Sequence, residues 1–156
     1  MARYLVEDRG LFQGSAAAVV RPADTDQVSR VMALCHEHGI HVVPQGGNTG
    51  TVGGAVSLSA QSIVLATERM DAVRFIDADN ATITVEAGCI LAHVQDAARD
   101  AGFLFPLSLG GEGSCRIGGN LSTNAGGINV LHYCNARELV LGLEVVLPDG
   151  RVWNGL

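Results

Sequence analysis

Glycine is concentrated in two nearly uncharged windows of this sequence, and this distribution constrains the fold more than any other feature. Twelve of the 20 glycines fall between Gly46 and Gly54 or between Gly110 and Gly127. Glycine permits positive φ and close approach to a ligand, but it costs about 0.5–1 kcal/mol relative to alanine inside a helix or strand. Successive N–H groups in a tight turn can hold a phosphate without any lysine. The two windows therefore predict a dinucleotide site built from backbone.

Two familiar nucleotide-binding motifs are absent from both windows. The stretch "GGNTGTVGG" lacks the G-K-[ST] ending of a P-loop, which argues against triphosphate hydrolysis. Neither window supplies G-x-G-x-x-G between a strand and a helix with an acidic residue at the ribose distance, so nicotinamide binding is not supported. The alternative, two glycine-rich surface loops with no ligand, remains open at this point.

Charge and composition exclude several classes of partner. The formal net charge is -6, and the ten Lys and Arg residues form no basic stripe, so we expect neither nucleic acid nor an anionic membrane surface as a partner. The long uncharged runs are rich in Gly, Asn, Thr and Ser, which predicts no membrane span. The segment after Met1 carries Arg3, Glu7, Asp8 and Arg9 and resembles no signal peptide, so a cytoplasmic location is expected.

The cysteine and histidine positions predict no metal site. Four cysteines lie far apart with no C-x-x-C pair, and the five histidines have no partner at ligand spacing. We expect the cysteines to be buried, reduced thiols.

The order of the elements predicts an α+β fold. A helix begins after Asp24, with Gln27 three residues later, and ends at Gly39. A second helix starts at Ile90 and ends at Gly102. Strands are expected at residues 17–20, 40–44, 62–67, 72–77 and 81–88, one helical turn at 118–125, and a closing hairpin at 141–155 with its turn at "PDG".

Four segments carry a resemblance to a known family. "VVPQGGNTGTVGGAV", "VEAGCILAHVQDAARDAGF", "GSCRIGGNLSTNAGG" and "VLGLEVVLPDGRV", in this order, closely resemble the FAD-binding domain of the vanillyl-alcohol-oxidase-type, FAD-linked oxidase flavoproteins. Within that superfamily they are most similar to the D-2-hydroxyglutarate, D-lactate and glycolate dehydrogenase branch. The resemblance implies an α+β FAD-binding domain of two subdomains, the first at about residues 1–70 and the start of the second at about 71–156. It also implies that the domain is truncated within the second subdomain and that the substrate domain is absent.

The resemblance implies FAD contacts in both windows and in the closing strand. In such domains the first glycine loop wraps the pyrophosphate, which implicates Pro44, Gln45, Gly46, Gly47, Asn48, Thr49, Gly50 and Gly53. The second window supplies further positions, namely Pro106, Leu109, Gly110, Gly113, Ser114, Ile117, Gly118, Gly119, Asn120, Thr123, Asn124, Gly126 and Gly127. In the closing strand the matching positions are Gly142 and Val145.

Two departures from the family pattern bear on the cofactor. Asn48 stands where some members carry the histidine that links FAD covalently, so the resemblance implies non-covalent, dissociable FAD. The chain reads "SLGGEGS" where the branch often reads "DLGAKGS", and this weakens any statement about fine specificity near the flavin ring.

The implied activity is oxidation of a small D-2-hydroxy acid to the 2-oxo acid by the parent protein, with an unidentified electron acceptor. The catalytic base and the carboxylate-binding residues would lie beyond Leu156, so no residue here is assigned a catalytic role. We expect the chain alone to bind FAD poorly and to show no turnover, and assembly into a homo-oligomer is left open. Two alternatives remain: a flavoprotein of the same superfamily acting on a sugar lactone, aldehyde or ether-lipid precursor, and a non-catalytic binding module that keeps the fold.

Overall fold

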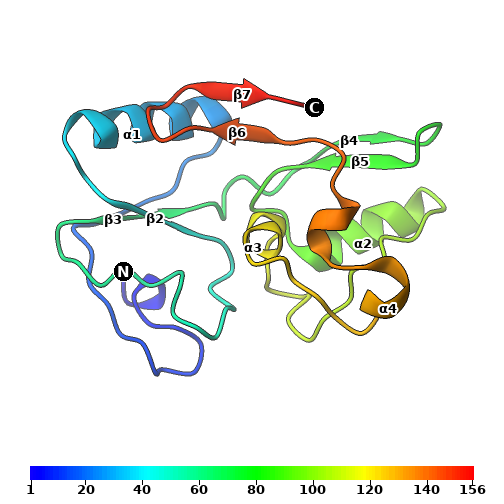
Figure 1. Cartoon of the computed structure of the whole chain (residues 1–156), viewed down its shortest axis with the longest axis horizontal. Coiled ribbons are helices and arrows are strands. Elements are labelled where there is room, and N and C mark those ends of the chain that lie inside the picture. The colour runs from blue at the N-terminus through cyan, green and yellow to red at the C-terminus, as the bar shows by residue number, and fades with distance from the viewer. The chain divides into compact units, whose positions relative to one another are not determined.

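The computed structural model describes residues 1–156, which form two compact units (Figure 1). Unit 1 comprises Met1–Arg69 together with Leu141–Leu156, and unit 2 comprises Met70–Val140. The closing hairpin, which the resemblance places in the second subdomain, groups with unit 1 in the structure. Both units combine helices with small sheets, which confirms the α+β prediction.

Unit 1 is built on a parallel three-stranded sheet in the order β1-β3-β2. Its strands are β1 (Ala18–Val20), β3 (Ile63–Ala66) and β2 (Val42–Gln45). The central strand β3 is buried along its whole length, as its continuous apolar sequence predicts for a strand covered on both faces. A short 3-10 helix, η1 (Ala2–Tyr4), adds Tyr4 to the core cluster with Val64 and Ala66.

Helix α1 (Thr25–Glu37) connects β1 to β2 and has the predicted caps. The Asp24 carboxylate accepts a hydrogen bond from the Gln27 N–H at 2.7 Å, and the Gln27 side chain accepts one from the Ala23 N–H at 3.0 Å. Gly39 adopts φ +64° just after the helix, where a residue with a side chain would be strained. The predicted start and end of this helix are confirmed.

The closing hairpin packs on α1, which explains why it belongs to unit 1. Strands β6 (Glu144–Val146) and β7 (Val152–Asn154) pair antiparallel around a turn at Gly150. The Thr25 hydroxyl donates to the Glu144 carboxylate, and the Ser29 hydroxyl donates to the Gly150 carbonyl, each at 2.5 Å. Figure 1 shows the hairpin lying along α1. The predicted hairpin is confirmed.

Unit 2 combines one hairpin with short helices around a small apolar core. Strands β4 (Val73–Asp77) and β5 (Thr82–Val85) pair antiparallel. The helices are α2 (Leu91–Asp100), α3 (Ile117–Ser122), α4 (Val130–Tyr133) and the 3-10 helix η2 (Ala136–Leu139). The core consists of Leu91, Leu107, Cys115 and Ala136. The sequence did not predict α4 or η2, because each is too short to show a helical period.

None of the helices has both the length and the apolar character that crossing a bilayer requires. The side chains of His, Cys, Asp and Glu form no group suited to hold a metal ion.

The four cysteines are free thiols, but they do not share one environment. Cys35, Cys89 and Cys115 are buried, and burial raises the pKa of each thiol. Cys134 is exposed, so the expectation that all four are buried is wrong at this position. Cys134 directly follows the single turn of α4 and has φ +63°. The sequence pattern does not predict this local geometry.

We expect one thiol of the folded chain to react quickly with an aromatic disulfide reagent near pH 8. The thiolate is the reactive form, so a raised pKa and burial both slow Cys35, Cys89 and Cys115, whereas Cys134 is accessible. Spectrophotometric counting of released thiolate should show one fast thiol in the folded chain and four after denaturation. Cys134→Ser should remove the fast phase, and a fast phase that survives this substitution would contradict the assigned environments.

Candidate cofactor-binding site

The first glycine window is a loop whose two ends are joined by one buried side chain. Gln45, the last residue of β2, has only 2% of its surface exposed. Its amide nitrogen donates to the Tyr4 carbonyl at 2.9 Å and to the Ala55 carbonyl at 2.8 Å. Gln45 therefore closes the loop and ties it to the N-terminal segment.

The backbone N–H groups of this loop are unpaired. From Gly46 to Ala55, no N–H donates a hydrogen bond within the chain. Carbonyl groups of the same loop are used: Thr51 accepts from Arg9 at 2.6 Å, and Gly53 accepts from the Val56 N–H at 3.0 Å. Since backbone donors almost always find a partner, this loop can offer its N–H groups to solvent or to an anionic ligand.

Asn48 has an unusual backbone and an unpaired acceptor. Its φ is +54°, a conformation that asparagine tolerates better than most residues. Its side-chain nitrogen donates to the Val6 carbonyl at 2.7 Å, while its Oδ1 atom is buried without a partner. Buried acceptors are normally hydrogen-bonded, so water or a ligand hydroxyl is a suitable donor to this oxygen.

The second window contains helix α3, and most N–H groups of its first turn are satisfied by the chain. Ile117 donates to Cys89, Gly118 to Ala87 and Asn120 to Arg116, at 2.8–3.0 Å. The N–H of Gly119 donates to nothing, and the same holds for Gly110 and Gly113 in the preceding turn. Most unpaired donors of this window are therefore glycines, and the Arg116 N–H is also unpaired.

The end of α3 is a helix cap rather than an anion-binding nest. Asn124 adopts φ +50°, and the N–H groups of Asn124 and Ala125 donate to Leu121 and Asn120 in a Schellman pattern. These donors are used within the chain. The left-handed conformation of Asn124 is thus explained by the local fold, and no ligand is needed to account for it.

At some glycines of the predicted site, the packing of the chain leaves little or no room for a side chain. A Cβ atom on Gly127 would lie 2.0 Å from the Ser108 carbonyl oxygen, and one on Gly53 would lie 2.8 Å from the Phe12 ring. A Cβ on Gly118 would lie 3.0 Å from Ala87, and one on Gly126 would lie 3.2 Å from the Asn135 side chain. A Cβ on Gly142 would lie 2.5 Å from the Gly155 carbonyl oxygen.

Other glycines of the predicted site have no such reason. No atom lies within 4 Å of a Cβ built on them, and none has positive φ; they are Gly50, Gly110, Gly113 and Gly119. Neither strain nor packing explains why these positions lack a side chain. Close approach of a ligand would account for it.

The remaining predicted residues divide between framework and surface. Leu109 and Ile117 pack on the core of unit 2, and Asn120 is 5% exposed and donates to the Cys115 sulfur at 3.5 Å. The Pro106 carbonyl accepts from Asn129, and the Thr123 hydroxyl donates to Gly119. Pro44, Thr49, Ser114 and Val145 are exposed or half-buried, and the hydroxyl groups of Thr49 and Ser114 form no hydrogen bond within the chain. The first window, Gly142 and Val145 lie in unit 1, and the second window lies in unit 2.

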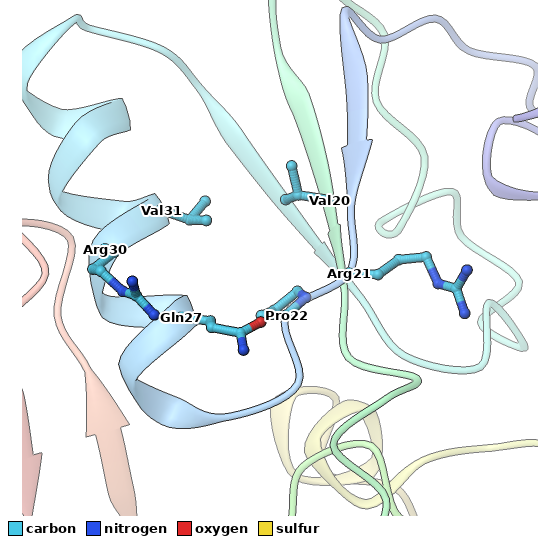
Figure 2. Close-up of a pocket in the computed structure, with 6 residues that line it drawn as sticks. All are labelled: Val20, Arg21, Pro22, Gln27, Arg30 and Val31. Carbon is cyan, nitrogen blue, oxygen red and sulfur yellow. The ribbon is translucent and has the colours of Figure 1, made fainter.

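A separate recess of about 390 Å³ lies beside the start of α1, and no predicted site residue lines it (Figure 2). Figure 2 shows Val31 directed toward Val20, while the Arg21 side chain points away from α1. Arg21 pairs with Glu68, and Arg30 pairs with Asp26 at 3.0 Å. Both cations that line the recess are thus paired with carboxylates.

Sequence reasoning missed the contacts of the N-terminal segment with the first glycine window. Arg9 reaches the Thr51 carbonyl, and the Phe12 ring covers Gly53. The segment "EDRGLF" has no period, cap or motif that could have identified this role.

Comparison with known proteins relates the chain to flavoproteins. A family model described as "FAD binding domain" matches residues 16–155. A mitochondrial D-2-hydroxyglutarate dehydrogenase of Danio rerio is 46% identical over 144 residues, covering 92% of this chain and 27% of that protein. A putative mitochondrial D-lactate dehydrogenase of Schizosaccharomyces pombe is 39% identical over 145 residues, covering 93% and 27%. The chain thus spans about a quarter of the length of these relatives.

Solved structures share the fold at low sequence identity. An alkyldihydroxyacetonephosphate synthase matches with a TM-score of 0.82 and 19% identity, over 93% of this chain and 26% of that one. The 6-hydroxy-D-nicotine oxidase of Arthrobacter nicotinovorans matches with a TM-score of 0.78 and 18% identity, over 96% and 31%.

The expected cytoplasmic location is wrong on this comparison. Both dehydrogenases above are named as mitochondrial proteins, and so are other relatives from plants and mammals.

Proposed function

The chain belongs to the FAD binding domain family, and from this we propose that it is the FAD-binding part of a flavin-dependent dehydrogenase that oxidises a D-2-hydroxy acid to the 2-oxo acid. The observation that carries the proposal is the first glycine loop, whose N–H groups from Gly46 to Ala55 are all unpaired within the chain. A pyrophosphate is the part of FAD that such donors fit.

Open glycines occur in each unit. Gly50 in unit 1, like Gly110, Gly113 and Gly119 in unit 2, leaves room for close approach of a ligand to its own part of the backbone. The unpaired Oδ1 of Asn48 is suited to accept a hydrogen bond from a ribityl or ribose hydroxyl. Because an asparagine amide at this position is not a nucleophile, we propose that FAD is held without a covalent bond.

The hydroxy acid substrate is supported by relatives that are 39–46% identical to this chain. Two of these relatives, at 46% and 39% identity, are named as a D-2-hydroxyglutarate dehydrogenase and a putative D-lactate dehydrogenase, whereas the synthase and the oxidase of known structure are 19% and 18% identical. The chemistry that FAD supplies when bound is acceptance of a hydride from the α-carbon while the hydroxyl loses its proton. The part of this chain in that reaction is to bind and orient the cofactor, and we assign no catalytic residue to it.

Titration of the purified chain with FAD tests the proposal. We expect weak but saturable quenching of flavin fluorescence with a change in the visible spectrum, and loss of both in the double variant Gly47→Asp, Gly119→Asp, whose carboxylates would repel the phosphates. ADP should compete with FAD, whereas riboflavin should not, because the loops contact the pyrophosphate. A wild-type chain that is folded by circular dichroism and binds no FAD would overturn the proposal.

A further inference from the structure

The N-terminal loop, residues Val6–Gln13, is a closed structure of its own. Val6 and Gln13 form an antiparallel bridge, and the Glu7 N–H donates to the Phe12 carbonyl at 3.1 Å. The Gly10 N–H returns to the Glu7 carbonyl at 2.9 Å, and Gly10 adopts φ +71°. These bonds define one conformation of the loop.

A buried carboxylate organises the interior of this loop. Glu7 is 2% exposed, and its two oxygens accept hydrogen bonds from the Arg9 N–H at 2.8 Å and the Leu11 N–H at 3.0 Å. These N–H groups, Arg9 first, hold the pKa of the Glu7 carboxyl below its usual range, so it is ionised at neutral pH. Each N–H faces a different carboxylate oxygen, so a glutamine in the same conformation would place its amide nitrogen, a donor, against one of them.

The N-terminal loop holds the first glycine loop at three points. The Val6 carbonyl accepts from the Asn48 side chain at 2.7 Å, and the Arg9 guanidinium donates to the Thr51 carbonyl at 2.6 Å. The Phe12 ring lies against Gly53, where a Cβ would come within 2.8 Å of it. None of these contacts uses an N–H of the glycine loop. The loop is fixed through its carbonyls and side chains, and its donors stay available.

We propose that Glu7 is a positioning residue for the cofactor: its carboxylate shapes the N-terminal loop, which fixes the first glycine loop with its N–H groups available to the FAD pyrophosphate. This inference rests on the proposed function. It assigns a role in FAD binding to a segment that need not touch the cofactor.

Positioning by Glu7 and charge repulsion by Glu7 predict opposite changes in FAD affinity when its charge is removed. Glu7 is an anion near a loop proposed to bind an anion, so by Coulomb's law alone its removal should tighten FAD binding. Positioning predicts the opposite. Asp8 provides a matched control, because it is an exposed neighbouring carboxylate whose side chain forms no hydrogen bond within the chain.

Titration with FAD of the wild-type chain, Glu7→Gln and Asp8→Asn tests the inference. We expect Glu7→Gln to raise the Kd about tenfold, since a charge-assisted hydrogen bond in the loop is lost. Asp8→Asn, with the same change in charge, should leave the Kd within about twofold of wild type. Equal or tighter binding by Glu7→Gln would overturn the role of Glu7 and leave the proposed function intact. A folded wild type that binds no FAD would overturn both.

A second pair of variants keeps the test decisive if Glu7→Gln does not fold. Gly10 and Gly39 have similar positive φ values, +71° and +64°, and a Cβ on either would meet no atom within 4 Å. Alanine should therefore strain both sites similarly. Only Gly10→Ala distorts the N-terminal loop, so it should raise the Kd severalfold while Gly39→Ala does not. If the two variants had equal Kd values at similar melting temperatures, the N-terminal loop would contribute to the fold and not to FAD binding. This result would overturn the inference.

Discussion

Gly119→Ala is expected to stabilise the folded chain and at the same time to weaken FAD binding by about tenfold or more. Gly119 lies inside α3, where alanine is more favourable than glycine by up to about 1 kcal/mol. A Cβ there meets no atom of the chain within 4 Å, so the fold itself does not oppose the substitution. The same methyl group would occupy the space that we propose the cofactor needs. Thermal melting by circular dichroism and FAD titration measure the two effects.

Gly118→Ala is the matched control in the same helix. Its Cβ would lie 3.0 Å from both the Cβ and the carbonyl oxygen of Ala87, so we expect it to lower stability, by about 1–3 kcal/mol, as overpacking does. The two neighbouring substitutions should therefore change the melting temperature in opposite directions. If Gly119→Ala bound FAD as tightly as the wild-type chain, α3 would not be part of the cofactor site.

Gly127→Ala is expected to cost on the order of 3 kcal/mol of stability or more, from steric overlap and backbone strain together. Gly127 has φ +149°, and a Cβ would lie 2.0 Å from the Ser108 carbonyl oxygen. That oxygen also accepts a hydrogen bond from the Ile128 N–H at 3.0 Å, so moving it away would break a second interaction. For a chain of this length, we expect the melting temperature to fall by roughly 6–12 °C.

Gly110→Ala is the comparison for Gly127→Ala. Gly110 lies in the same window, has no positive φ and would place its Cβ in open space. We expect its melting temperature to stay within about 2 °C of wild type, since substitutions away from packing and strain rarely cost much. A similar fall in melting temperature in Gly110→Ala and Gly127→Ala would contradict the contact between Gly127 and Ser108.

Local sequence signals predicted much of the fold. Asp24 and Gln27 were identified as the start of α1 from their spacing, and the structure shows the corresponding hydrogen bonds. Gly39 and Gly102 mark helix ends with positive φ, and the "PDG" turn lies between β6 and β7. Each of these signals acts over a few residues, so it can be read without knowing what packs nearby.

The sequence predicted only part of the candidate site. Both glycine windows were identified, but their glycines were treated as equivalent. The structure separates Gly127, which the chain needs because of Ser108, from Gly119, which it does not. It also shows Asn124 in a helix cap, a role that its motif "TNAGG" does not distinguish from ligand binding. The direction of a missing Cβ depends on the backbone, and sequence does not give it.

The sequence by itself determined the elements, the two windows and the resemblance that led to FAD, because caps, turns and apolar periods are short-range properties of the chain. Only the tertiary structure decided which backbone donors stay unpaired and what holds them in place. Gln45 joins Tyr4 to Ala55, Arg9 reaches Thr51, and Glu7 is buried inside its own loop. Gln45 and Tyr4, like Arg9 and Thr51, lie about 40 residues apart, and neither their pairing nor the burial of a charged residue follows from any local pattern.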